Sequence, residues 1–404
     1  ENPRPLADIR RSFALIKDAV GSKLPQVAIM ERAARLFVQH GKARSEGGDR
    51  TARDWRGLER RAEIDPVGRV LIIAGATGGI DEERLAGYDA HLRAALGGCD
   101  AQVLSGGTTA GICGLVARVA AEQDAGQPDG RRFFGYLPEK LPAGVKCAGA
   151  PVELIKTPGA TNFSIHEPLQ MWTDLLVSGV DPGRVVLLCL GGGEISSAEL
   201  ALAWAFGAKA AVIDDGSEAS VCFGDLLDWA GKERAAGILV PDDPTTLSAL
   251  LCFRAPGNSD ADIKWNEEWE LPGRAVHEAY LRDQSKHAKE PNLLPWDLLP
   301  PDLKHSNRHQ AFYAAEILRE HGFVVGKSDL APGEIPLPEF TDDDKPLIER
   351  MAEAEHGRWN AERLHQGWRH GEKKDVEHKI SPYLVPWHRL PNQIKDYDRM
   401  AVRQ

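Results

Sequence analysis

The residues that point most directly to a chemical role in this 404-residue chain are glycines, which gather in three groups. Each group follows a short apolar run and precedes a segment with helical spacing, as in Ser105-Gly106-Gly107-Thr108-Thr109-Ala110-Gly111. Glycine lets a backbone approach a ligand closely, and the free N–H groups at the start of a helix favour phosphate. Three such turns on one sheet edge predict a site for a diphosphate-bearing ligand. The members of this predicted site are Gly75, Thr77, Gly106, Gly107, Thr108, Gly111, Gly191, Gly192, Gly193, Glu194 and Ser196.

Residues 66–253 must position these turns, and they alternate short apolar runs with helical patterns. The candidate strands are 69–75, 101–105, 133–136, 152–156, 184–190, 209–213 and 237–240. The candidate helices are 82–96, 112–123, 167–178, 196–206 and 220–229. The run Val185-Val186-Leu187-Leu188-Cys189-Leu190 is apolar at every position, which is typical of parallel strands covered on both faces. We therefore expect an open, Rossmann-like α/β parallel sheet, whose ligands bind outside the carboxyl ends of the strands. The first turn lacks GxGxxG and the chain lacks GxxxxGK[ST], which disfavours an ordinary dehydrogenase or a P-loop NTPase.

The C-terminal third contains an internal repeat. The run Leu294-Pro295-Trp296-Asp297-Leu298-Leu299-Pro300 returns 91 residues later as Val385-Pro386-Trp387-His388-Arg389-Leu390-Pro391. Upstream, Ala275-Val276-His277-Glu278 returns only 79 residues later, so the second copy holds a 12-residue insertion. The repeat predicts two small, mainly α-helical modules, at residues 264–327 and 345–404.

Aromatic and cationic residues of the second module could form a ligand pocket. Aromatic faces stack on bases, and a guanidinium group pairs with phosphate through two hydrogen bonds. The candidate pocket residues are His356, Arg358, Trp359, Trp368, Tyr397 and Arg399. The Pro-Trp pairs fix an extended connection, so we interpret Trp296 and Trp387 as anchors of each module's core.

Composition narrows the classes of partner. A net charge of −11 excludes a basic field over the whole surface, so broad nucleic-acid binding is not expected. No apolar run reaches the length of a membrane span, and the six cysteines lack metal-ligand spacing. We therefore expect a cytoplasmic protein that needs no metal or cofactor. We also expect it to form a homo-oligomer. Residues 1–65 predict a helical extension with helices at 8–20 and 27–37, and a membrane or effector segment upstream of Glu1 stays open.

Residues 66–250 resemble the SLOG superfamily of Rossmann-like nucleotide binders, which includes the Lonely Guy phosphoribohydrolases and the N-terminal region of melastatin-type TRP channels. Gly106-Gly107-Thr108 with Gly111-Ile112, and Gly191-Gly192-Gly193 with Glu194 and Glu199, carry this resemblance. Pro168 and Leu169 stand where Lonely Guy enzymes have an Arg-Lys pair, so that catalytic pattern is incomplete.

The C-terminal modules resemble the RyR domain, which is repeated in ryanodine receptors and found in bacterial proteins. The second copy matches through Glu355-His356-Gly357-Arg358-Trp359, Gly367-Trp368, Val385-Pro386-Trp387 and Tyr397-Asp398-Arg399.

Together these resemblances imply a sensor or effector that binds a nucleotide-derived second messenger, such as ADP-ribose or cyclic ADP-ribose, in bacterial signalling or antiphage defence. The alternative is a Lonely Guy-like nucleotide N-glycosidase, with Glu199 or Glu194 as the acidic group and His166 in place of the lost cation. A third possibility is a scaffold in which the glycine turns only pack. Whether the chain is an enzyme stays open, and the missing arginine favours the sensor.

Overall fold

The computed structural model of the chain describes ten stretches, and the statements below concern these alone. They are residues 59–76, 78–97, 100–124, 132–157, 162–164, 166–230, 237–252, 260–284, 293–325 and 340–403. The helices expected at 8–20 and 27–37 lie outside them. The chain divides into two compact units, which meet in the sequence between Asp242 and Asp243.

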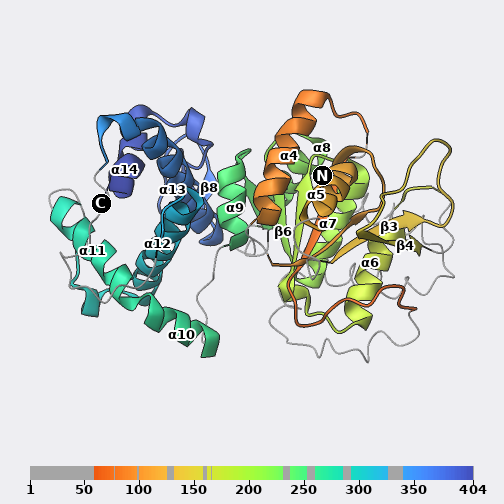
Figure 1. Ribbon diagram of the computed structural model, residues 1–404, viewed down its shortest axis with the longest axis horizontal. Helices are drawn as coiled ribbons and strands as arrows, with labels where there is room; N and C mark the ends of the chain where they lie inside the picture. The colour runs from red at the N-terminus through yellow and green to blue at the C-terminus, as the bar shows by residue number, and fades with distance from the viewer. Residues whose placement is uncertain are drawn as a thin grey trace. The chain divides into compact units, whose positions relative to one another are not determined.

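The first unit is built on a seven-stranded sheet in which every neighbouring pair of strands is parallel (Figure 1). The strands are β1 (Val70–Gly75), β2 (Gln102–Gly106), β3 (Phe133–Pro138), β4 (Val152–Thr157), β5 (Val185–Leu190), β6 (Lys209–Ile213) and β7 (Gly237–Val240). Their order is β4-β3-β2-β1-β5-β6-β7. The seven predicted strands and the open parallel sheet are thus confirmed.

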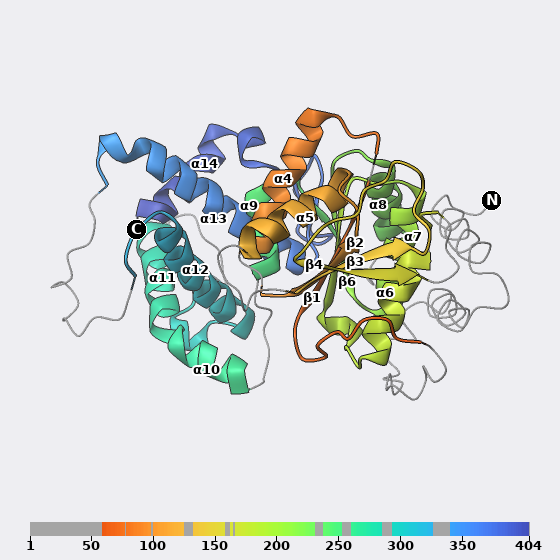
Figure 2. The same cartoon turned by 45° about the vertical axis from the view of Figure 1, so that its right-hand side comes forward.

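Helices cover both faces of this sheet (Figure 2). They are α4 (Glu82–Gly97), α5 (Gly111–Asp124), α6 (His166–Val177), α7 (Glu194–Phe206) and α8 (Glu218–Ala230). Helices α6, α7 and α8 share one apolar core with the strands, in which the rings of Trp172 and Phe206 lie 4.8 Å apart. Helices α4 and α5 pack together on the opposite face. Burial on both faces explains why β5 is apolar throughout.

The chain reverses its direction of travel across the sheet between β1 and β5. It runs from β1 outward to β2, β3 and β4, then returns through α6 to β5 and continues to β6 and β7. Strands β1 and β5 are hydrogen-bonded neighbours, so their following loops diverge in opposite directions. Such a point leaves a crevice outside the carboxyl ends of the two strands, where open α/β sheets bind ligands.

The second unit is mainly helical, as the repeat predicts. Its helices are α9 (Pro244–Cys252), α10 (Asp260–Glu268), α11 (Glu270–Gln284), α12 (Pro301–Glu320), α13 (Lys345–His365) and α14 (Asn392–Arg403). Helix α11 packs against α12, and α13 packs against both α12 and α14.

Helix α9 packs against α13, although the sequence assigned residues up to 253 to the α/β domain. The contact is close because Gly357 of α13 has no side chain. A Cβ atom on Gly357 would lie 2.7 Å from the carbonyl carbon of Thr245. Further along, a ring nitrogen of His365 lies 3.3 Å from the carbonyl oxygen of Leu250.

No helix in the described part of the chain is both long and apolar enough to cross a membrane.

Candidate functional site

The three glycine turns follow β1, β2 and β5, which are adjacent strands of the sheet. Because neighbouring parallel strands end at the same edge, all three turns lie along one carboxyl edge. Thr77 in the first turn lies outside the described residues, and so does the side chain of Glu194. The structure thus brings the three turns to one edge, and whether they bind phosphate stays a prediction.

Several of these glycines are required by packing within the protein itself. A Cβ on Gly75 would lie 2.4 Å from the carbonyl oxygen of Leu190, and one on Gly106 would lie 2.6 Å from Sγ of Cys113. A Cβ on Gly107 would lie 3.0 Å from the carbonyl oxygen of Gly135 in β3. The glycines after β1 and β2 therefore need no ligand to explain them, and Thr108 beside them is buried.

The glycines after β5 have a conformational role. Gly191 and Gly192 adopt φ values of 67° and 113°, in the left-handed region that favours glycine. The N–H of Gly191 donates to Oδ2 of Asp215 at 3.0 Å, and Gly192 lies against buried Ser196. Gly111, at the start of α5, also has a positive φ of 54°.

Gly193 is the N-cap residue of α7, and no side chain caps this helix end. A Cβ on Gly193 would lie 3.3 Å from Oε2 of Glu218, so this carboxylate lies close to the helix start. The first N–H groups of a helix lack intrahelical acceptors, and the helix dipole adds positive potential there. The α7 start therefore offers backbone donors to an anion, while the charge of Glu218 opposes it.

A polar network that the sequence analysis missed holds the β5 turn in place. The hydroxyl of Tyr88 donates to Asp215 at 2.7 Å, and Arg84 donates to Asp242 at 2.6 Å and lies 3.4 Å from Asp215. His91 lies 3.2 Å from Asp242. Burial alone would raise the pKa of Asp242, yet its bonds with His91 and Arg84 lower it to about 2. The sequence contained evidence for this network. Arg84, Tyr88 and His91 share one face of α4, and Asp215 and Asp242 each follow a strand.

Two carboxyl groups with raised pKa values lie in the first two turns of α6 and α7, at Glu167 and Glu199. Burial, with repulsion from Glu167, raises the pKa of Glu199 to about 8. Burial also raises the pKa of Glu167 to about 7, against the hydrogen bond that its Oε2 accepts from the N–H of Ser164 at 2.8 Å. The Oε1 atom of Glu167 is buried without a hydrogen-bond partner among the described residues. Both pKa values are therefore raised toward neutral pH, mainly by burial.

His166 does not supply the cation that the enzymatic alternative needs. Its Nδ1 lies 2.8 Å from Oγ of Ser164, and burial lowers its pKa from an ordinary value of 6.5. The imidazole is therefore neutral at pH 7.

The second unit contains the same histidine–carbonyl contact in both copies of the repeat. In the first copy Nε2 of His277 lies 2.8 Å from the carbonyl oxygen of Leu294. In the second copy Nε2 of His356 lies 2.9 Å from the carbonyl oxygen of Val385. The same contact thus recurs at the offsets of 79 and 91 residues seen in the sequence.

The interpretation of Trp296 and Trp387 as core anchors is confirmed, since both side chains are buried. Their rings lie 6.0 and 5.9 Å from the histidine of the same copy. Arg308 lies 5.7 Å from the first tryptophan ring, and Arg399 lies 5.8 Å from the second.

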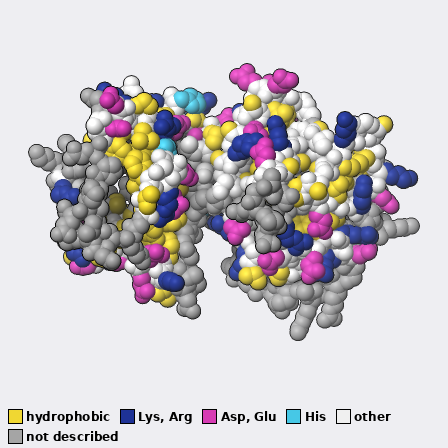
Figure 3. Space-filling model, viewed as in Figure 1, with side chains coloured by type: hydrophobic (Ala, Val, Ile, Leu, Met, Phe, Trp, Pro, Cys, Tyr) yellow, Lys and Arg dark blue, Asp and Glu magenta, His cyan; other side chains and the backbone are white. Residues whose placement is uncertain are grey.

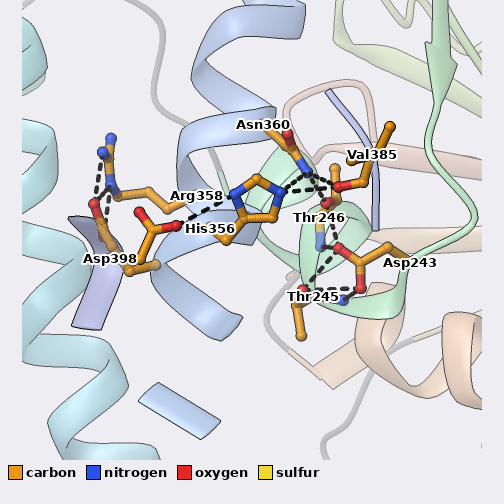
Figure 4. A network of polar contacts seen from close by, with 9 residues as sticks. Asp243, Thr245, Thr246, His356, Arg358, Asn360, Val385 and Asp398 are labelled. Carbon is orange, nitrogen blue, oxygen red and sulfur yellow. Dashed lines mark hydrogen bonds and ion pairs between the residues drawn. The ribbon is translucent and has the colours of Figure 1, made fainter. Parts of the chain in front are cut away.

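His356 is held on several sides (Figure 4). Its Nδ1 lies 3.5 Å from a carboxylate oxygen of Asp398, while its Nε2 faces Val385. Its ring stacks on Trp359 at 5.8 Å with an interplanar angle of 17°. With 2% of its surface exposed, His356 serves the core of its module.

Asn360 links α13 to the start of α9 (Figure 4). Its Nδ2 donates to Oγ1 of Thr246 at 3.0 Å, and Asp243 accepts from the N–H groups of Thr245 and Thr246 at 3.3 and 3.0 Å. Asp243 therefore caps α9, a role in which aspartate is favoured.

Arg358 is fully engaged by two acidic neighbours. Its Nε and Nη2 both donate to Oε1 of Glu355, and its Nη1 donates to Glu362 at 2.7 Å. All three side chains are buried. Despite burial, the charge of Arg358 holds the pKa of Glu362 at about 2, whereas burial raises the pKa of Glu355.

The remaining candidates of the second module are spread over different environments. Arg399 pairs with Glu349 and Asp396, and Tyr397 is 57% exposed. Trp359 and Trp368 are half-buried, and the rings of both lie close to Arg363, a residue that the sequence analysis did not select.

The described residues contain no group of three or more His, Cys, Asp or Glu side chains that could hold a metal ion. On the face drawn in Figure 3, the described Lys and Arg side chains lie among Asp and Glu side chains.

Two solved structures are similar to part of this chain. The molybdenum cofactor carrier protein of Chlamydomonas reinhardtii matches at 18% identity with a TM-score of 0.30, over 43% of this chain and 91% of its own. The molybdenum cofactor binding protein of Rippkaea orientalis matches at 18% identity with a TM-score of 0.29, over 42% of this chain and 86% of its own. The resemblance to the SLOG superfamily stays a prediction.

The C-terminal part has a match of its own. It covers the second copy of the repeat, with the buried His356 and Trp387 described above. Residues 334–404 match the family described as RyR domain.

Proposed function

We propose that this protein is a sensor that binds a nucleotide-derived second messenger, such as ADP-ribose or cyclic ADP-ribose, at the crevice between β1 and β5. The observation that carries the proposal is the start of α7 at Gly193, which no side chain caps and which lies at the point where the chain reverses direction. An N-terminal helix end with unpaired N–H groups suits a diphosphate.

The arrangement around this helix start favours binding. The Arg84–Tyr88–Asp215 contacts hold the Gly191 turn, so the backbone N–H groups are positioned before a ligand arrives. Such preorganisation lowers the cost of binding. A response then requires that the ligand prefer one arrangement of the protein over another. The RyR domain at 334–404 supports a signalling role, and the SLOG resemblance supports bacterial signalling or antiphage defence.

The test is a thermal-shift titration of wild type, Gly193→Asp and Gly193→Asn with ADP-ribose and cyclic ADP-ribose. Both substitutions place a favoured capping residue at the α7 start, so both variants should fold. The aspartate also puts a negative charge where the phosphate would bind. We expect wild type and Gly193→Asn to be stabilised, by about 2.7 kcal/mol at 100 times the Kd, and Gly193→Asp to show no shift. A full shift in Gly193→Asp would contradict this site, and no shift in wild type would contradict this ligand class.

A second candidate function is cleavage of a nucleotide N-glycosidic bond, and the raised pKa values of Glu167 and Glu199 favour it. A protonated Glu199 could donate its proton to a departing base. Base release from AMP-type nucleotides, followed by chromatography, should then fall above pH 8, where this acid is ionised. Glu199→Gln should lower the rate by about 10²–10⁴-fold, while Glu372→Gln, at an exposed position of the second unit, serves as a control. Absence of base release from wild type would contradict the enzymatic function.

A further inference from the structure

The guanidinium group of Arg363 lies close to two indole rings of the second RyR-like module. Its central carbon is 5.5 Å from the ring centre of Trp359, one turn earlier in α13, and 5.4 Å from that of Trp368, just beyond the helix. Cation–π attraction to both rings stabilises the position of the guanidinium, whose N–H groups can still donate to a partner.

Arg363 has little compensation for its charge. Its hydrogen bond runs from Nη1 to Oε1 of Gln366 at 3.0 Å, and among the described residues no carboxylate lies within ion-pair distance. The adjacent Glu362 is occupied, because it accepts from Arg358 and Ser306, each at 2.7 Å. Burial lowers the pKa of Arg363, although the charge of the neighbouring Glu362 acts in the opposite direction. An anion beside the guanidinium would offset the cost of burial.

A second cation lies nearby. Lys379 donates from Nζ to the carbonyl oxygen of Gln366 at 2.7 Å, so Gln366 contacts both cations. A planar fork beside an ammonium group suits a phosphate, which accepts several hydrogen bonds and carries more than one charge.

This cluster is a feature of the second copy alone. At the offset of 79 residues, Tyr280 and Gln284 take the places of Trp359 and Arg363 in the first copy. Trp368 and Lys379 belong to the longer connection between the histidine and its carbonyl partner, which spans 29 residues in the second copy against 17 in the first. The residues that build the cluster are therefore not needed for the shared core of the two modules.

We propose that Arg363, which contacts the rings of Trp359 and Trp368 and is linked to Lys379 through Gln366, forms an anion-binding site for a phosphate-bearing small molecule. The site differs in every residue from the one at the start of α7. It therefore stands whether or not the sheet-edge site binds a nucleotide.

The test is a titration of the full chain with sodium pyrophosphate at constant ionic strength, followed by tryptophan fluorescence, because two indoles flank the site. We expect saturable binding by wild type, an apparent Kd about tenfold or more higher in Arg363→Gln, and a smaller rise in Arg363→Lys, which keeps the charge and loses the fork. Arg389→Gln removes an exposed arginine of the same module and should bind like wild type.

Several outcomes would overturn the site. They are no saturation in wild type up to about 10 mM, unchanged affinity in Arg363→Gln, or an equal loss in Arg389→Gln. Lys379→Gln lies on the exposed connection and should raise the Kd without disturbing the core, so it carries the test if Arg363→Gln does not fold. Gly193→Asp should leave pyrophosphate binding at Arg363 intact, and a loss of all binding in that variant would assign the anion to the sheet edge instead. Adenosine, which lacks phosphate, should not compete.

Discussion

Replacing Arg358 with methionine should destabilise the C-terminal unit by about 3–5 kcal/mol, because it leaves two buried carboxylates without their cation. Glu355 and Glu362 expose only 6% and 5% of their surface, and both bind Arg358. Methionine has a comparable length and helix propensity, so lost packing and lost helix stability contribute little. Urea denaturation followed by the helical signal would measure the change in free energy of unfolding.

The same variant should depend on pH in a definite direction. Without Arg358, burial raises the folded-state pKa of both glutamates above their unfolded values. A carboxyl group with a raised folded pKa loses stability as the pH rises, so Arg358→Met should be least impaired at low pH and most impaired at neutral pH. Adding Glu355→Gln and Glu362→Gln removes the buried charges and should restore much of the stability. A triple variant no more stable than Arg358→Met would show that the guanidinium acts through packing.

Replacing Gly357 with valine should cost about 2–3 kcal/mol, toward the upper end of the range for overpacking. The new Cβ would lie 2.7 Å from the carbonyl carbon of Thr245, which belongs to the backbone of α9 and cannot rotate away. Hydrogen exchange should show increased opening of α9 and of the facing part of α13. Protection of both helices at the wild-type level would mean that α9 does not depend on this contact.

The control for Gly357→Val is Gly87→Val in α4. A Cβ on Gly87 would meet nothing within 4 Å, so only helix propensity changes there, in favour of valine by a few tenths of a kcal/mol. Opposite signs for the two substitutions would separate steric overlap from propensity. Destabilisation of similar size at both positions would contradict the steric explanation.

Much of the fold follows from local pattern. Strands such as 185–190 are apolar at every position because both faces are covered. A run of six apolar residues is therefore enough to predict a buried strand. The repeat was visible because the Pro-Trp anchor needs the same residues in each copy. The carboxyl edge of the sheet was foreseen for a similar reason, since glycines mark turns that follow parallel strands.

Other features depend on which distant segments meet. Helix α9 packs on α13 at Gly357, and a single glycine in a helix does not show which segment packs against it. Arg358 looked like a phosphate ligand in the sequence, because nothing local shows that Glu355 and Glu362, at spacings of three and four residues, turn toward it in the interior. Arg363 was missed because Trp359 precedes the end of α13 and Trp368 follows it, so the sequence does not show that both rings contact one side chain.

The two histidine–carbonyl contacts have a consequence for how such a module can change. They close segments of 17 and 29 residues with almost the same geometry, at 2.8 and 2.9 Å. Lengthening a closed segment by that ratio costs only about 0.5 kcal/mol of loop-closure entropy. The module therefore tolerates insertions between its anchors, and its surface chemistry can diverge between copies while the framework stays constant. The same segment is the natural place to graft a foreign loop or reporter peptide.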